Sequence, residues 1–209
     1  MYLITGESGI IVVDPGVSTE DAESFCNLPG LSKGECHIKL ILLTHGHYDH
    51  IKYIDDWIDA YPTAKVLFSS NDKELLSNGF LNCSYMDGED ISYDFEFINL
   101  AGTHGQTAYK DDEAEIKSYE TPGHTRGSLC FLIEIGGKEL FFTGDTLFCG
   151  SVGRTDMPGG SYRELADSLR RISRFSPDLR IFPGHGPDST IGAEIASNPF
   201  LLRINQELS

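Results

Sequence analysis

Four short segments of this chain carry side chains that could bind metal ions and activate water. Residues 45–50 read His-Gly-His-Tyr-Asp-His, so three imidazoles and one carboxylate stand in one short stretch. His124, Asp145 and His185 each follow an apolar run and a glycine that lets the backbone turn sharply. Imidazole and carboxylate groups suit zinc, iron or manganese. Because no cysteine stands among them, the pattern argues against a thiolate-rich structural zinc site.

The alternative explanation for each histidine is an ordinary core or surface position. A single histidine is more often that than a ligand, and His37 and His104 are interpreted in this way. Five of the seven histidines, however, stand at the ends of three expected strands, with Asp49 and Asp145 beside them. Such clustering is hard to obtain by chance, so we interpret the whole set as a metal site.

These side chains need a scaffold that brings several strand ends together. Short apolar or β-branched runs predict strands, and helical spacing of apolar residues predicts helices. The expected strands are residues 10–13, 38–43, 65–69, 129–135, 139–143 and 179–182. The expected helices are residues 19–27, 51–58, 72–77 and 162–175, with a short one beginning at Ile191 and a tail from Pro199. Strand ends of one layer lie along one edge, so loops distant in sequence can converge there.

The middle of the chain, residues 79–118, gives a weaker pattern. Apolar and polar residues alternate over residues 92–98, which favours a strand. We expect one or two strands here, followed by a long acidic loop through residues 111–113. In the helix predicted before this region, Asn71 is the expected cap of residues 72–77.

Length and charge bound the class of protein. The chain has 209 residues, of which 40% are hydrophobic, so we expect one domain over residues 1–209 with a sizeable core. The formal net charge is −16. Because such a surface repels polyanions, nucleic acid and anionic membranes are poor partners. The oligomeric state is left open by these features.

The cysteines and the N-terminal residues indicate the compartment. Five cysteines occur without any CxxC pair, which favours reduced thiols over a disulfide framework. No basic segment followed by a long apolar stretch is visible at the start, and no apolar run reaches the ~18 residues of a membrane helix. The sequence therefore predicts a cytoplasmic protein.

Taken together, the motifs resemble the metallo-β-lactamase superfamily in order and rough spacing. They are HxHxDH at residues 45–50, TPGHT at 121–125, GDTLF at 144–148 and PGHG at 183–186. Residues 150–156 and 191–200 are similar to the glyoxalase II-like hydrolases within it. The resemblance implies an α/β fold, a four-layer αββα sandwich with the site at one edge.

The resemblance also implies how the ligands are shared between two divalent metal ions, with zinc the first expectation and iron or manganese the alternatives. The first ion would be held by His45, His47 and His124. The second would be held by Asp49, His50 and His185, with Asp145 bridging both.

The activity that follows from this resemblance is hydrolysis by a metal-bridging hydroxide. The substrate would be a small thioester or related acyl compound, because a thiolate leaves easily. Asp145 and Asp49 are the expected catalytic carboxylates, with Asp49 orienting the nucleophile or passing a proton to the leaving group. Asp14 and Thr44 are candidates for supporting the ligand histidines, with turn formation as the alternative role.

Recognition of glutathione is less well supported than the metal site. A glyoxalase II adds a helical domain after the last histidine, whereas few residues follow His185 here. Arg154 is the nearest match to a substrate-binding basic residue, and Arg126 is a second candidate. A structural ion pair is the alternative role for both. Relatives also carry a strand before residues 2–5, where this chain begins.

Four other functions are alternatives to the hydrolysis of thioesters. A persulfide dioxygenase has a similar fold but uses one iron and oxygen. A β-lactamase is less favoured because common zinc lactamases place cysteine where Asp145 stands. A nuclease is opposed by the net charge of −16. A non-catalytic module that kept the fold would hold no metal.

Overall fold

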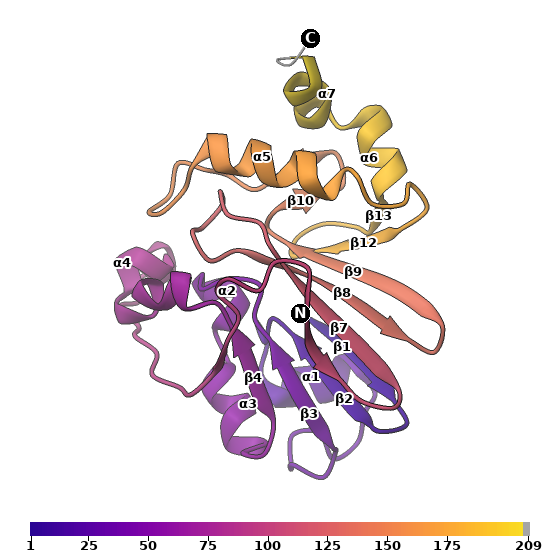
Figure 1. Cartoon of the computed structure of the whole chain (residues 1–209). Coiled ribbons are helices and arrows are strands. Elements are labelled where there is room, and N and C mark those ends of the chain that lie inside the picture. The colour runs from indigo at the N-terminus through magenta and orange to yellow at the C-terminus, as the bar shows by residue number, and fades with distance from the viewer. Residues whose placement is uncertain (207–209) are drawn as a thin grey trace. The chain divides into compact units, whose positions relative to one another are not determined.

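The computed structural model describes residues 1–206, and the chain divides into two compact units (Figure 1). The first unit is Met1–Asn99, and the second is Leu100–Ser209. Each unit is built on one sheet with helices packed against it, as expected for one half of an αββα arrangement. The expectation of a single domain over residues 1–209 stays a prediction.

The sheet of the first unit runs in the order β1-β2-β3-β4-β5. Strands β1 and β2 pair antiparallel, and β2 to β5 pair in parallel. The strands are β1 Tyr2–Gly6, β2 Gly9–Val13, β3 Ile38–Leu42, β4 Lys65–Phe68 and β5 Ile98–Asn99. The helices are α1 Thr19–Cys26, α2 Tyr48–Ile51, α3 Ile54–Ala60, α4 Gly79–Asn82, and the 3-10 helices η1 Ser70–Ser77 and η2 Ser84–Asp87. The strands predicted at residues 10–13, 38–43 and 65–69 are therefore confirmed.

The core of the first unit explains why its central strands are mostly apolar. Every residue of β3 is buried, as is typical of a parallel strand covered on both faces. Ile41 of β3 shares a cluster with Ala22 of α1 and Trp57 of α3. The Trp57 indole nitrogen donates to the Val17 carbonyl at 2.9 Å, so the polar end of the ring is satisfied within the core.

Two helices of the first unit differ from the sequence prediction. The single helix expected over residues 51–58 is instead two, α2 and α3, separated by Lys52 and Tyr53. The helix predicted at residues 72–77 is the 3-10 helix η1, and its cap is Ser69 rather than Asn71. The Ser69 hydroxyl accepts from the Asn71 backbone N–H at 3.3 Å. The spacing of apolar residues predicted the buried faces of these helices but not where each helix begins and ends.

The alternation over residues 92–98 reflects burial rather than strand pairing. In this stretch only Ile98 belongs to a strand, β5. Tyr93 is buried in the core of the first unit, and Phe95 and Phe97 pack against it. An extended segment that buries every second side chain has the period of a strand without needing a hydrogen-bonded neighbour.

The sheet of the second unit runs in the order β13-β12-β9-β8-β7-β6. Only β9 and β12 pair in parallel, and the other neighbours are antiparallel. The strands are β6 Gln106–Lys110, β7 Ala114–Glu120, β8 Leu129–Ile135, β9 Lys138–Gly144, β12 Arg180–Pro183 and β13 Ser189–Thr190, with β10 Leu147–Phe148 and β11 Ser151–Val152 as a separate ribbon. The helices are α5 Tyr162–Ile172, α6 Ile191–Ser197 and α7 Pro199–Gln206. The strands predicted at residues 129–135, 139–143 and 179–182 are confirmed, and the first two form an antiparallel hairpin.

Helix α5 covers this second sheet with the predicted apolar stripe. Leu165, Leu169 and Ile172 are buried in one cluster with Phe141 of β9. The helix ends at Ile172, three residues before the predicted end. The Ser161 hydroxyl caps its start by accepting from the Glu164 backbone N–H at 3.3 Å.

Two details of the second unit were not predicted. The expected long acidic loop is a tight turn between β6 and β7, in which the Asp111 carboxylate accepts from the backbone N–H of Glu113 and Ala114. The expected tail from Pro199 is helix α7. Proline at a first helical position needs no N–H partner, and the Asn198 side chain accepts from the Phe200 N–H at 3.0 Å.

The five cysteines are free thiols. Burial of Cys130 raises the pKa of its thiol to about 11, so the thiol stays protonated at neutral pH. Within residues 1–206, no helix has the length and apolar character that crossing a membrane requires.

Candidate metal centre

In the first unit, the loop after β3 gathers three of the candidate histidines. The rings of His45 and His47 lie 4.8 Å apart, edge to face. The ring of His50 lies even closer to His45, at 4.1 Å. Helix α2 begins directly after His47 and brings the His50 ring to the side of His45.

Asp49 stands at the exposed rim of this cluster. Its Oδ2 lies 3.7 Å from His50 Nε2, and just over half of its side chain is exposed. A carboxylate in that position is close to the His50 imidazole and is also open to solvent. The geometry therefore suits a group that exchanges protons with water.

Asp14 holds this loop together from the turn after β2. One carboxylate oxygen accepts from the Thr44 backbone N–H at 2.7 Å. The other accepts from the Thr44 hydroxyl at 2.7 Å and lies 2.9 Å from His50 Nδ1. The contacts expected of Asp14 and Thr44 as supports of ligand histidines are thus present. Asp14 has φ 52°, a left-handed conformation that aspartate tolerates better than most residues.

The same close packing requires a glycine at position 16. A Cβ at this position would lie 2.2 Å from the Asp49 carbonyl oxygen, so only glycine lets the turn approach α2 so closely. The Asp14-Pro-Gly turn therefore packs closely against the loop of residues 45–50.

Asp72 is a supporting residue that the sequence did not reveal. It is buried in η1, and its Oδ2 accepts from the Gly46 backbone N–H at 3.0 Å. This bond fixes the backbone between His45 and His47. Nothing in the local pattern separates Asp72 from an ordinary helical aspartate, because its partner lies 26 residues away.

In the second unit, three strand ends bring the remaining candidates together. Asp145 Oδ2 lies 3.5 Å from His124 Nε2 and 3.6 Å from His185 Nε2. Asp145 and His185 meet because β9 and β12 are parallel neighbours, and the Gly184 N–H donates to the Gly144 carbonyl at 2.8 Å. One carboxylate oxygen thus stands beside two imidazole nitrogens, an arrangement that suits a shared ligand.

Gly153 packs directly against this cluster. A Cβ there would lie 1.8 Å from the Asp145 carbonyl oxygen and 3.1 Å from the Cβ of His124. We expect Gly153→Ala to displace Asp145 or His124, because backbone has no room to yield at 1.8 Å. The expected results are a loss of bound metal and a free energy of unfolding lower by about 2 kcal/mol or more.

The matched control for that substitution is Gly136→Ala. A Cβ at Gly136 meets nothing within 4 Å, so this change costs only the strain of φ +57°. Metal analysis and thermal denaturation of both variants measure the difference. Wild-type metal content in Gly153→Ala would contradict the close packing described above.

Arg154 supports the cluster through its backbone rather than its side chain. His124 Nδ1 donates to the Arg154 carbonyl at 2.7 Å. The guanidinium is more than half exposed and forms two bonds to Asp156, at 2.7 and 2.8 Å. This pairing lowers the pKa of the Asp156 carboxyl to about 2. The structural ion pair is therefore present, and substrate binding by Arg154 stays a prediction.

A buried polar pair fixes the segment between Asp145 and Gly153. Glu194 accepts from the Gly150 N–H at 2.8 Å and from the side-chain amide of Asn198 at 2.8 Å. That amide also donates to the Ser151 carbonyl at 3.0 Å. Sequence reasoning assigned no role to either residue.

The donor atoms of the candidate ligands fit divalent metal ions. The Thr44 hydroxyl gives its one proton to Asp14, so its oxygen accepts from His45 Nδ1 at 3.1 Å. His50 Nδ1 likewise donates to the Asp14 carboxylate, and His124 Nδ1 donates to the Arg154 carbonyl. Each of these three rings therefore carries its proton on Nδ1 and presents the Nε2 lone pair. Imidazoles oriented in this way, with carboxylates beside them, are typical metal ligands.

Comparison with known proteins identifies the family to which the chain belongs. The model of the metallo-β-lactamase superfamily matches residues 1–185. A probable metallo-hydrolase of Streptococcus pyogenes is 31% identical over 206 residues, which cover 95% of this chain and 84% of the relative. The hydroxyacylglutathione hydrolase GloC of Haemophilus influenzae is 30% identical and matches 93% of this chain and 88% of its own length.

A solved structure extends the comparison to the fold. The crystal structure of TTHA1623 in a di-iron-bound form superposes with a TM-score of 0.77 at 29% identity, covering 96% of this chain and 93% of that one. The chain belongs to the metallo-β-lactamase superfamily. Both the expected family and the α/β metallo-β-lactamase fold are thereby confirmed.

Proposed function

We propose that this chain is a dinuclear metal-dependent hydrolase of thioesters or related small acyl compounds. The observation that carries the proposal is Asp145, whose Oδ2 stands 3.5 and 3.6 Å from the Nε2 atoms of two histidines. A hydroxyacylglutathione hydrolase among the relatives at 30% identity supports the acyl and thioester class. Membership of a metallo-hydrolase family supports hydrolysis in general.

We propose the ligand sets that the sequence resemblance implies. His45, His47 and His124 hold one ion, Asp49, His50 and His185 hold the other, and Asp145 is shared. When bound, two divalent ions lower the pKa of a water molecule and polarise a carbonyl oxygen. Zinc is the first candidate, and the di-iron form of TTHA1623 makes iron a direct alternative.

The chain's own residues orient the ligands and move a proton. Asp14 and the Thr44 hydroxyl fix the tautomers of His50 and His45, so the Nε2 atoms stay available. Hydrolysis adds an oxygen to the acyl carbon, breaks the carbon–sulfur bond and delivers a proton to sulfur. Asp49, which is exposed and 3.7 Å from His50, is the group that we propose carries that proton. Arg154 as a substrate contact and a cytoplasmic location remain predictions from the sequence.

The decisive experiment combines metal analysis with a substrate panel. We expect two metal ions per chain and turnover of aromatic and hydroxyacyl thioesters, with slower turnover of lactones. Oxygen uptake and nitrocefin hydrolysis are measured in parallel. One iron per chain with oxygen consumption would replace the proposal by a persulfide dioxygenase, and fast nitrocefin turnover would replace it by a β-lactamase. Purified chain without metal or activity would indicate a non-catalytic module.

A further inference from the structure

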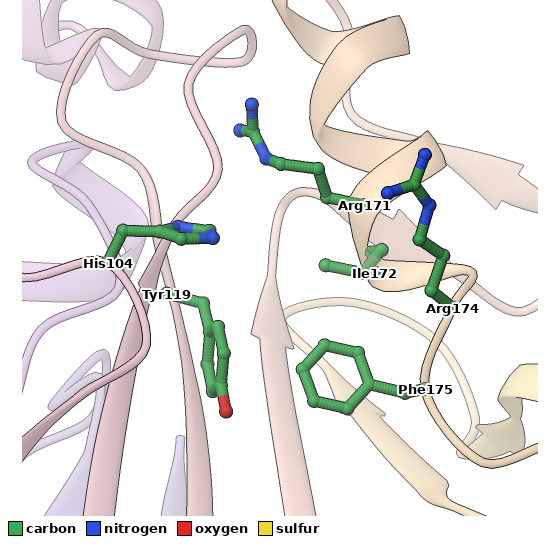
Figure 2. A pocket seen from close by; sticks show the side chains of 6 residues that line it. All are labelled: His104, Tyr119, Arg171, Ile172, Arg174 and Phe175. Atoms are coloured by element: carbon green, nitrogen blue, oxygen red, sulfur yellow. The ribbon is translucent and has the colours of Figure 1, made fainter.

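The second unit contains a cavity of about 430 Å³ that the proposed hydrolase chemistry does not use. Figure 2 shows its walls, which come from the loop before β6, from β7 and from the C-terminal end of α5. The lining residues are His104, Tyr119, Arg171, Ile172, Arg174 and Phe175. The volume lies within the range of small-molecule sites, ~300–1,000 Å³.

One end of this cavity is cationic. Its charge comes from the guanidinium groups of Arg171 and Arg174, and the imidazole of His104 belongs to the same lining (Figure 2). No acidic residue lines it, although the chain carries 32 acidic residues against 16 basic ones. The two arginines of this lining therefore have no lining carboxylate to balance their charge.

The two arginines differ in what holds them. Arg171 donates to the Glu120 carbonyl at 3.1 Å and to the Ser168 hydroxyl at 3.0 Å, which orients its guanidinium. Arg174 forms no side-chain hydrogen bond or ion pair with any residue in the described part of the chain. The helix dipole accounts for a basic residue in the last turn, such as Arg171. It does not account for Arg174, which follows the end of α5 at Ile172.

The other end of the cavity is aromatic. The rings of Tyr119 and Phe175 meet edge to face at 5.0 Å, and Phe175 lies 5.0 Å from the buried ring of Phe141. His104 contacts Tyr119 edge to face at 5.6 Å. These contacts place the rings before any ligand arrives, so a planar group can pack against them without ordering the wall.

This cavity lies at the opposite end of α5 from His124. The helix begins where the Ser161 N–H donates to the Gly123 carbonyl, and the cavity is formed by its last turn. The 11 residues of α5 span roughly 16 Å. A ligand in the cavity is therefore separate from the His124 and Asp145 cluster.

We propose that this cavity binds a small molecule that joins a planar aromatic ring to an anionic group of the phosphate type. The ring packs against Tyr119 and Phe175, and the anion accepts from Arg174 and Arg171. Charge-assisted bonds from guanidinium to phosphate are the strong kind, and their forked geometry gives direction. The proposal is independent of the hydrolase function.

Isothermal titration of the purified metal-bound protein with phenyl phosphate tests it. We expect Arg174→Ala to weaken binding at least tenfold. The matched control is Arg163→Ala, which removes the same charge from an exposed position at the start of the same helix. It should bind within twofold of wild type. Phe175→Leu, which keeps apolar bulk but removes the ring, should also weaken binding, and thioester turnover should stay unchanged in Arg174→Ala.

Two further probes separate the parts of the ligand. Inorganic phosphate and phenol should each bind at least tenfold more weakly than phenyl phosphate. Equal binding of phosphate and phenyl phosphate would overturn the role of the aromatic end. Phenyl phosphate binding that Arg174→Ala leaves unchanged would place the ligand elsewhere, and no binding in the millimolar range would also overturn the proposal.

Discussion

Asp145→Ala is expected to remove bound metal and to lower thioester turnover by about 10³-fold or more, because several kcal/mol of transition-state stabilisation come from the ions. Asp145 Oδ2 stands beside the Nε2 atoms of His124 and His185, so its loss leaves both imidazoles without the carboxylate between them. The fold should survive, since alanine fits the space and the neighbouring strands β9 and β12 remain paired. Metal content per chain and kcat/KM are the measurements.

The control for Asp145→Ala is Asp178→Ala. Asp178 is an exposed carboxylate of the same unit, outside the candidate metal centre. We expect it to keep wild-type metal content and activity. If Asp145→Ala keeps two metal ions and full turnover, Asp145 is not the shared ligand and the proposed mechanism is wrong.

Asp14→Asn is expected to lower metal affinity and activity by about 10–100-fold with little change in fold, as is typical for partners of ligand histidines. The amide oxygen can still accept from the Thr44 N–H. The amide nitrogen, however, cannot accept from the Thr44 hydroxyl or from His50 Nδ1. His50 then favours the tautomer with its proton on Nε2, which removes the lone pair that a metal ion needs.

Titration of metal-free protein with zinc, followed by activity, measures this effect. Asparagine also tolerates the left-handed backbone of position 14, so strain does not confuse the comparison. Asp59→Asn is the control, because it makes the same chemical change at an exposed helical position of the same unit. Wild-type zinc affinity in Asp14→Asn would show that Asp14 serves only the turn.

The elements with strong local patterns could be predicted from the sequence. The apolar run of β3, the hairpin of β8 and β9 and the stripe of α5 are all present as expected. Breaks and caps were less accessible. Residues 51–58 do not form one helix because the Tyr53 N–H donates to the Pro15 carbonyl at 3.1 Å, a partner that only the folded chain brings close.

The alternation over residues 92–98 is a second case in which a local pattern did not predict the element correctly. Its period recorded which side chains are buried and was interpreted as a strand. Strand pairing needs a neighbouring backbone at the right distance, and only Ile98 and Asn99 have one in β4. The sequence of a single segment can show which of its side chains are buried. Hydrogen-bond pairing also depends on a second segment, which the fold must bring alongside.

The sequence by itself determined the chemistry available to this protein. The residue types at positions 45–50, 124, 145 and 185 limit the site to imidazole and carboxylate donors, and their motif order indicates the family that the comparisons confirm. Tertiary structure decided which nitrogen His45, His50 and His124 present and which residues hold these rings in place. Asp14 was a candidate from the sequence, but Asp72 and the Arg154 carbonyl act on partners 26 and 30 residues away, so no local pattern carries their roles. The physical reason is that a tautomer follows from a hydrogen bond, and a hydrogen bond follows from where the folded chain places both groups.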